Sequence, residues 1–296
     1  MNISVITTMK AKTISFIFML LFSANLFGQN VHSYKLNSNN GHLFMTADIC
    51  GEQREIMVES GIPALLIGQD FYERALAGGD LAFEPSQAKI RMLNNLYEIT
   101  YKADGELQIG QDKYCGPIFI LKDYDGRISL PIQNLYDESG HRTVSVDISN
   151  GRLSVGEIAE NTEKCYMLHL DKKTGVPIVK AKVAISSQES KAVLKGNLIV
   201  DFGNPMLVFL MTQHRSVSKA IKNGKIIPQD ARDANGNIVA QGIFAEAVTV
   251  CGQDYNDISI GLTGKMTAIK DMGFLGIPFF NSAVAFDFDN GRMFVF

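Results

Sequence analysis

The stretch "MVESGIPALLI" at residues 57–67 recurs later in the chain as "IVDFGNPMLVF" at residues 199–209. In this alignment Glu59 falls on Asp201, and the glycines and prolines that follow the two acids also coincide. Each copy ends an apolar run with one acid. Burying a charged carboxylate without a partner costs on the order of several kcal/mol, so each acid needs a compensating group.

Further motifs repeat in the same order. "IGQD" at residues 109–112 matches "CGQD" at residues 251–254, and "DISNGR" at residues 147–152 matches "DFDNGR" at residues 287–292. Self-similarity of this kind indicates that one structural unit occurs twice. We therefore expect two similar lobes, with an N-terminal lobe over 35–156, a linker over 157–164 and a C-terminal lobe over 165–296.

The local sequence signals favour strands. Short segments rich in β-branched and aromatic residues alternate with Asn-Gly and other turn dipeptides, which is typical of hairpins. Only the segments 69–79 and 212–224 have a helical pattern, and each ends in glycine, a common helix stop. The sequence predicts an all-β fold of two β-barrel lobes, with one short helix per lobe and a central cleft.

The first 28 residues have the pattern of a signal peptide. Lys10 and Lys12 precede an apolar core over 14–27, which is too short for a membrane span of roughly 20 residues. We expect this segment to be removed, and the mature protein to be periplasmic or secreted. No later stretch is apolar enough to span a bilayer.

Composition excludes several classes of function. The 296-residue chain has a net charge of −3 and a pI near 6.0, without a basic run, which argues against nucleic-acid binding. The histidines are scattered and form no metal-binding motif, so we expect no metal. Four cysteines allow either free thiols or disulfides; they are Cys50, Cys115, Cys165 and Cys251.

Two equivalent lobes that meet at a two-fold axis would bring their equivalent turns together. Glu59 would then face Asp201. Two adjacent carboxylates cannot both ionise easily, so they share a proton and one pKa rises. Such a pair can hold a water molecule, deprotonate it and protonate a leaving group, and it needs no cofactor.

The acid-x-Gly turns, the "FLG" at residues 274–276 and the ending "FDFDNGRMFVF" at residues 286–296 resemble the retropepsin/pepsin clan of aspartic peptidases, particularly bacterial aspartyl-protease-like proteins. The resemblance covers roughly residues 40–296. It implies that each lobe contributes an Asp-Thr/Ser-Gly triplet. The two aspartates form the catalytic dyad, the hydroxyls lock the two turns together, and a hairpin flap covers the cleft.

Carried over to this sequence, the resemblance makes Glu59 and Asp201 the catalytic pair. It also implies two further sets. The turn-supporting residues are Ser60, Gly61, Phe202, Gly203, Ser129 and Gly276. The flap or substrate-binding residues are Tyr97 and Tyr101, on the segment 93–101, with Asn235 and Gly236 in the corresponding hairpin of the other half.

Three positions depart from the family pattern. Glu59 has one methylene more than aspartate, which moves its carboxylate by about 1 Å where catalytic geometry tolerates roughly 0.5 Å. Phe202 lacks the bracing hydroxyl. Ser129 is aligned with the glycine that the other half keeps as Gly276.

Two functions remain open. The chain is an exported aspartic-type endopeptidase that these substitutions make weak or inactive, or it is a pseudopeptidase that binds a peptide or another ligand in the cleft without cutting it. The substitutions favour the second. A third interpretation treats the acids as turn carboxylates bonded to backbone amides, with no chemistry. Because one chain supplies both lobes, we expect a monomer.

Overall fold

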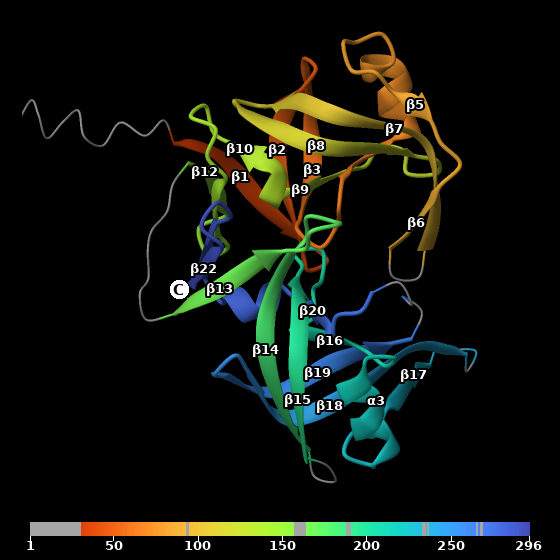
Figure 1. Cartoon of the computed structure of the whole chain (residues 1–296), viewed down its shortest axis with the longest axis vertical. Helices are drawn as coiled ribbons and strands as arrows, with labels where there is room; N and C mark the ends of the chain where they lie inside the picture. The colour runs from red at the N-terminus through yellow and green to blue at the C-terminus, as the bar shows by residue number, and fades with distance from the viewer. Residues whose placement is uncertain are drawn as a thin grey trace, which may run out of the picture.

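The computed structural model describes residues 31–92, 95–156, 164–187, 191–232, 235, 237–264, 266 and 269–296. The predicted signal peptide, residues 157–163 of the predicted linker, and Gly236 lie outside these residues. Figure 1 shows two β lobes stacked along the long axis, joined by a central layer of strands. The predicted all-β, two-lobe fold is confirmed.

The N-terminal lobe is built on a sheet that begins with three consecutive antiparallel strands. Its elements are β1 (His32–Asn39), β2 (His42–Ile49), β3 (Glu52–Glu59), β4 (Leu65–Gly68), α2 (Gln69–Phe71), the π-helix η1 (Tyr72–Leu76), β5 (Glu84–Pro85), β6 (Lys89–Met92), β7 (Asn95–Ile109), β8 (Asp112–Leu121), β9 (Ile128–Pro131), the 3-10 helix η2 (Ile132–Asn134), β10 (Leu135–Tyr136), β11 (Thr143–Asp147) and β12 (Arg152–Val155).

The C-terminal lobe has a similar order of elements. They are β13 (Cys165–Leu170), β14 (Pro177–Ser186), β15 (Lys191–Val200), β16 (Val208–Met211), α3 (Arg215–Lys222), β17 (Gln229–Arg232), β18 (Ile238–Val250), β19 (Gln253–Thr263), β20 (Gly273–Leu275), the 3-10 helix η3 (Ile277–Phe280), β21 (Ala283–Asp287) and β22 (Arg292–Val295). Here β17 alone stands in the place of β5 and β6, and β10 has no counterpart among the described residues.

Both lobes place the strand that leads to the acid at the centre of a sheet. In the N-terminal lobe β3 lies parallel to β9, β9 is antiparallel to β4, and β4 is parallel to β8. In the C-terminal lobe β15, β20, β16 and β19 repeat this pattern. Neighbouring strands therefore fix the end of β3 and the end of β15 in equivalent positions.

A sheet shared by both halves joins the lobes. We call it the interlobe sheet: its antiparallel order is β1-β12-β11-β21-β22-β13, and the join is the pairing of β11 with β21. Buried apolar side chains alternate along these strands. Val144 and Val146 from β11 belong to the same core cluster as Val284 and Phe286 from β21.

The helices are short, as predicted. The N-terminal lobe has one turn of α-helix continued by η1. The helix α3 spans eight residues, and the residue before it, His214, caps it by accepting a hydrogen bond from the Ser216 amide. In the described part of the chain, no helix has the length and apolar character needed to cross a membrane. All four cysteines are free thiols.

The strand register corrects one predicted equivalence. Ser129 pairs with Met57, whereas Pro131 pairs with Glu59; in the other lobe Leu275 pairs with Val200. Pro131 is therefore the counterpart of Gly276. The alignment of Ser129 with Gly276 is wrong because it matched the letters "GRIS" and "GFLG" and not the strand ends that pairing defines. The counterpart of Ser129 is Phe274.

Candidate functional site

The two acids lie against the glycines of the opposite turns. Glu59 is buried at the end of β3, with 7% of its surface exposed. A Cβ added to Gly203 would overlap the Glu59 carboxyl, and one added to Gly61 would lie 2.6 Å from the Asp201 Cγ. Only glycine allows each turn to approach the other acid so closely. The structure thus brings Glu59 and Asp201 together.

The two carboxyls are hydrogen-bonded to each other, and each one affects the pKa of the other. Burial raises the pKa of Glu59 well above its usual range, and the Asp201 charge and hydrogen bond raise it further. Burial raises the pKa of Asp201 to about 6, against the lowering effect of the hydrogen bonds from the Gly203 amide, Glu59 and the Gly61 amide. Gly203 N donates to Asp201 Oδ1 at 2.9 Å. Glu59 therefore holds the shared proton more strongly than Asp201 does.

Ser60 connects the two turns with a single hydroxyl. Its Oγ donates to the Val200 carbonyl oxygen at 2.8 Å and accepts a hydrogen bond from the Phe202 amide at 3.1 Å. The Ser60 side chain is fully buried. One hydroxyl from the N-terminal lobe thus satisfies two backbone groups of the C-terminal lobe.

Phe202 makes no reciprocal hydrogen bond, because its side chain belongs to the core. The ring stacks on Phe280 with centroids 4.9 Å apart and planes 9° apart, and it meets the Phe286 ring edge-on at 5.9 Å. Stacked and edge-on aromatic pairs contribute about 0.5–1.5 kcal/mol beyond the burial of their area. The turn of the C-terminal lobe is therefore held by aromatic packing.

Ser129 and Gly276 have different local roles. Ser129 Oγ and Tyr124 OH are hydrogen-bonded at 2.6 Å in the interior. At Gly276 a Cβ would overlap the carbonyl oxygens of Met206 and Asn204, so the loop after Asp201 packs directly on this backbone. Tyr124 was not predicted as a site residue, since it stands in the polar segment "KDYDGR", which reads as an exposed turn.

The two predicted flap tyrosines separate. The Tyr97 ring lies 5.3 Å from the Tyr124 ring, on the side of the lobe that carries Ser129, whereas the Tyr101 ring lies 4.8 Å from Tyr72 in η1. Residues four apart in a regular strand share a face. Here the register of β7 shifts between Ile99 and Tyr101, and this irregularity turns Tyr101 to the other side. The structure places Tyr101 beside Tyr72 and Tyr97 beside Tyr124, and a role of either tyrosine at the cleft stays a prediction.

The corresponding hairpin of the C-terminal lobe is formed by β17 and β18. Asn235 is exposed in the connection between these strands. Gly236 lies outside the described residues, so its predicted role stays a prediction.

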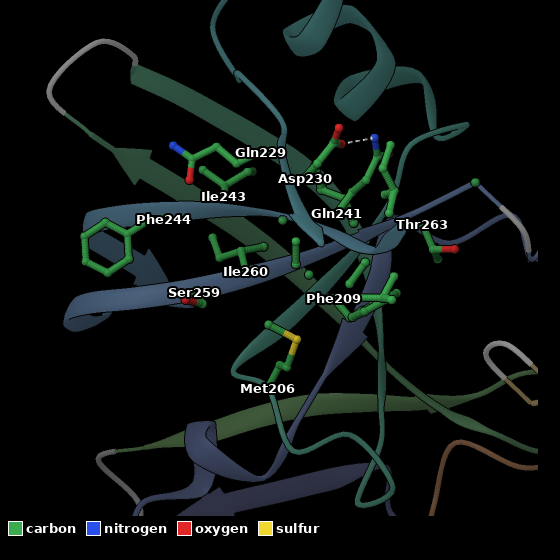
Figure 2. Close-up of a pocket in the computed structure, with 18 residues that line it drawn as sticks. Met206, Phe209, Gln229, Asp230, Gln241, Ile243, Phe244, Ser259, Ile260 and Thr263 are labelled. Atoms are coloured by element: carbon green, nitrogen blue, oxygen red, sulfur yellow. Dashed lines mark hydrogen bonds between the residues drawn. The ribbon is translucent and has the colours of Figure 1, made fainter. Parts of the chain in front are cut away.

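A pocket that sequence reasoning missed lies beside this hairpin. Side chains of β16, β17, β18 and β19 line it together with Met206, which follows the Asp201 turn in the sequence (Figure 2). The cavity has a volume of about 510 Å³. At the β17–β18 wall Gln241 donates to Asp230 Oδ1 at 2.9 Å. Phe244, also in the lining, is 50% exposed. The lining residues are scattered in the sequence and share no motif.

Within the described residues no group of three or more His, Cys, Asp or Glu side chains is arranged to hold a metal ion. The polar groups that converge at the site are the two carboxyls, the Ser60 hydroxyl and the glycine amides of the two turns. Chemically, this arrangement can hold one proton between two carboxyls and can bind a small polar molecule beside it.

Comparisons with known proteins show the fold. No protein-family model matches the chain, and no curated protein matches it in sequence. Among solved structures the chain is similar to the crystal structure of an aspartic proteinase from Irpex lacteus, with a TM-score of 0.51 and 11% sequence identity over 89% of this chain and 96% of that chain. The chain therefore has an aspartic-proteinase-like fold.

Proposed function

We propose that the protein is an aspartic-type endopeptidase-like protein, in which Glu59 and Asp201 hydrolyse an extended peptide slowly through a shared proton. The observation that carries this proposal is the buried, hydrogen-bonded carboxyl pair with both pKa values raised. Two acids from equivalent turns of two similar lobes, each held against the opposite glycine, are the arrangement that this chemistry requires.

The proton placement assigns the two roles. Asp201, the stronger acid, takes a proton from a water molecule bound between the carboxyls, and the water oxygen attacks the peptide carbonyl carbon. Glu59 gives its proton to the carbonyl oxygen, which yields a neutral tetrahedral diol. Collapse of the diol breaks the C–N bond. The Asp201 proton passes to the leaving nitrogen, and a diol proton returns to Glu59.

The rate is low because two elements of the pair are altered. The extra methylene of Glu59 displaces its carboxyl, and a misplacement of about 1 Å costs on the order of a hundredfold in rate. Of the middle residues of the two turns, only Ser60 braces the opposite turn with a hydroxyl, since the Phe202 side chain has turned into the core.

The pocket of the C-terminal lobe would receive a side chain of the bound peptide. Its volume of about 510 Å³ lies within the roughly 300–1,000 Å³ of small-molecule sites. Met206 connects it to the Asp201 loop, so a peptide lying across the acids would reach it.

A second candidate is a peptide-binding protein that does not cut. The specific observation in its favour is that a buried phenylalanine, Phe202, stands where the resemblance implies a residue with a hydroxyl. The pocket and the hairpins would serve such a role equally well, because an extended peptide can add a strand to an exposed sheet edge.

We also propose that the protein acts as a monomer after export and removal of roughly the first 28 residues. Amino-terminal sequencing of the fractionated protein tests the export. An intact amino terminus in the cytoplasm would contradict it.

The function is tested with the purified mature protein on a mixed peptide library between pH 3 and 8. Weak cleavage is expected to rise through about pH 6, as Asp201 ionises while Glu59 keeps its proton. Glu59→Gln and Asp201→Asn, which keep the size of each side chain, should abolish it. Cleavage that survives in both variants refutes the proposal, and binding without cleavage by the unmodified protein supports the second candidate.

A further inference from the structure

The two lobes differ beside their acids. Along β9, Ser129 pairs with Met57 of β3 and with Leu66 of β4. At the equivalent place in the C-terminal lobe, Phe274 pairs with Ile199 and Phe209, and these three side chains belong to one apolar cluster. One lobe therefore has a hydroxyl where the other has a phenyl ring.

The Ser129 hydroxyl lies on the same face of the sheet as the Glu59 side chain. Paired residues of parallel strands point to the same side, and so do residues two apart along one strand. Met57 pairs with Ser129, and Glu59 is two residues after Met57. Ser129 is thus a diagonal neighbour of Glu59 on that face.

Tyr124 completes a buried pair of hydroxyls. Its OH and Ser129 Oγ are 2.6 Å apart, and both residues are nearly inaccessible. The pair holds two hydrogens, and the bond between the hydroxyls uses only one of them. Burial is the largest cause that raises the pKa of the Tyr124 phenol, and the Glu59 carboxylate is one of the charges that raise it further.

The pair is also in contact with the β6–β7 hairpin. The Tyr97 ring of β7 meets the Tyr124 ring edge-on at 5.3 Å, and the Arg127 guanidinium lies 5.5 Å from the centre of the same ring. Met92 of β6, Ile99 of β7 and Ile62, which follows the Glu59 turn, lie in one cluster with Tyr124. Tyr124 is therefore packed between the hairpin and the turn that carries the acid.

We propose that Tyr124 and Ser129 are positioning residues for the Glu59 carboxyl, and that packing against the β6–β7 hairpin holds the Tyr124 ring in place. The inference rests on the proposed function of the acid pair. The hydroxyls provide a polar environment on one side of the longer acid, on the face where the strands beside Asp201 carry the apolar Ile199, Phe274 and Phe209. They fix the orientation of a side chain that has one more rotatable bond than aspartate.

The test measures the titration of Glu59 directly, by carboxyl-carbon NMR, in Tyr124→Phe and Ser129→Ala. Removing either hydroxyl leaves the carboxyl in a less polar environment, which disfavours its charged form, so its titration midpoint should rise by at least about half a pH unit. Ser129→Thr keeps the hydroxyl and should restore the midpoint. Tyr34→Phe removes a phenol that is bonded to Asp112 and should leave the midpoint unchanged.

The outcomes separate this inference from the proposed function. An unchanged Glu59 midpoint in folded Tyr124→Phe and Ser129→Ala overturns the positioning role, whether or not the protein cleaves peptides. A shifted midpoint in a protein without any cleavage supports the positioning role and refutes the enzyme. Where cleavage is found, both variants should lower kcat about tenfold with little change in KM, and equal losses in Tyr34→Phe would count against the proposal.

Discussion

The turn Glu59-Ser60-Gly61 and the turn Asp201-Phe202-Gly203 share a backbone arrangement and differ in what holds them. In both turns the glycine admits the acid of the other lobe. The middle residue reaches outward in one lobe, where Ser60 bonds to the backbone of its neighbour, and inward in the other, where Phe202 stacks on Phe280.

The difference shows that equivalent turns can be stabilised by unlike forces. Ser60 contributes two hydrogen bonds across the lobes, each worth about 0.5–1.5 kcal/mol net. Phe202 contributes buried apolar area and aromatic contacts. Loss of a buried phenyl ring costs about 3–5 kcal/mol, which is more than the two hydrogen bonds of Ser60 contribute together. Substitutions at the two positions should therefore differ in size, and each of the following measurements bears on that difference.

The largest effect is expected at Phe202. Replacing Phe202 by Ala leaves a cavity among Phe280 and Phe286 and should lower the free energy of unfolding by about 3–5 kcal/mol, measured by urea denaturation. Phe244→Ala, at a half-exposed ring, is the control and should cost far less. Equal losses at the two positions would mean that the aromatic cluster does not hold the turn.

The same packing bears on introducing the Asp-Thr/Ser-Gly triplet at the two turns. Phe202→Thr supplies the missing hydroxyl but also empties the ring's place in the core. The double variant Glu59→Asp with Phe202→Thr should therefore be less stable than the unmodified protein, and Glu59→Asp alone should recover little cleavage because residues that act as a unit are non-additive.

A smaller effect is expected at Gly276. A methyl group there would overlap the carbonyl oxygens of Met206 and Asn204, which overpacks the loop behind Asp201 and should cost about 1–3 kcal/mol. Gly78→Ala meets no atom within 4 Å and is the matched control. The thermal midpoints of the two variants provide the comparison, and a Gly276→Ala protein as stable as the control would show that the loop can move away.

Ser60→Ala should cost about 1–2 kcal/mol, because the Val200 carbonyl and the Phe202 amide lose their buried partner. The conservative change Ser60→Thr keeps the hydroxyl and separates its loss from a change of volume. If urea denaturation finds Ser60→Ala unaffected, the bridge between the turns has no energetic role.

The last effect concerns the pH dependence of stability. Asp201 has a pKa of about 6 in the folded protein and near 3.9 unfolded. Between these values the folded state binds a proton that the unfolded state does not, so this contribution to stability is full below about pH 4 and is lost as pH rises through about 6. Asp201→Asn should remove this contribution to the pH dependence of stability, which is about 3 kcal/mol for a shift of about two pH units.

Urea denaturation at pH 4, 5, 6 and 7 measures this dependence, with the exposed Asp104→Asn as the control. If stability fell more steeply with pH in Asp201→Asn than in the unmodified protein, ionisation of Asp201 would not be what destabilises the folded state as pH rises.

The repeated turns were sufficient to predict the fold and the pair of acids to examine. The repeated motifs occur in the same order in both halves, which indicated the order of the strands. The expected two-fold relation between the halves then predicted that Glu59 lies opposite Asp201. Strand pairing decides the rest. Ser129 was misaligned with Gly276 because similar letters stood two positions away from the paired ends. The separation of Tyr101 from Tyr97 was not foreseen, because it arises from a shift in the register of β7.

The inward turn of Phe202 could not be predicted for a related reason. Its partners Phe280 and Phe286 are distant in sequence and meet it only after the lobes have folded. The pocket at Met206 and Phe209 has the same origin, since four strands contribute to its wall. Tertiary contacts, which leave no local pattern, determined both.

The interlobe sheet also determines what a broken chain would do. Three of its strands come from each half, and only β11 and β21 meet across the middle. If the backbone were cut between residues 157 and 163, each fragment would keep its own three strands and expose one bare edge. An unpaired edge is a template for the strand that fits it, so the two fragments would recognise one another and rebuild the acid pair. The covalent connection keeps the two halves together at low concentration. The pairing of β11 with β21 determines that each half binds the other half.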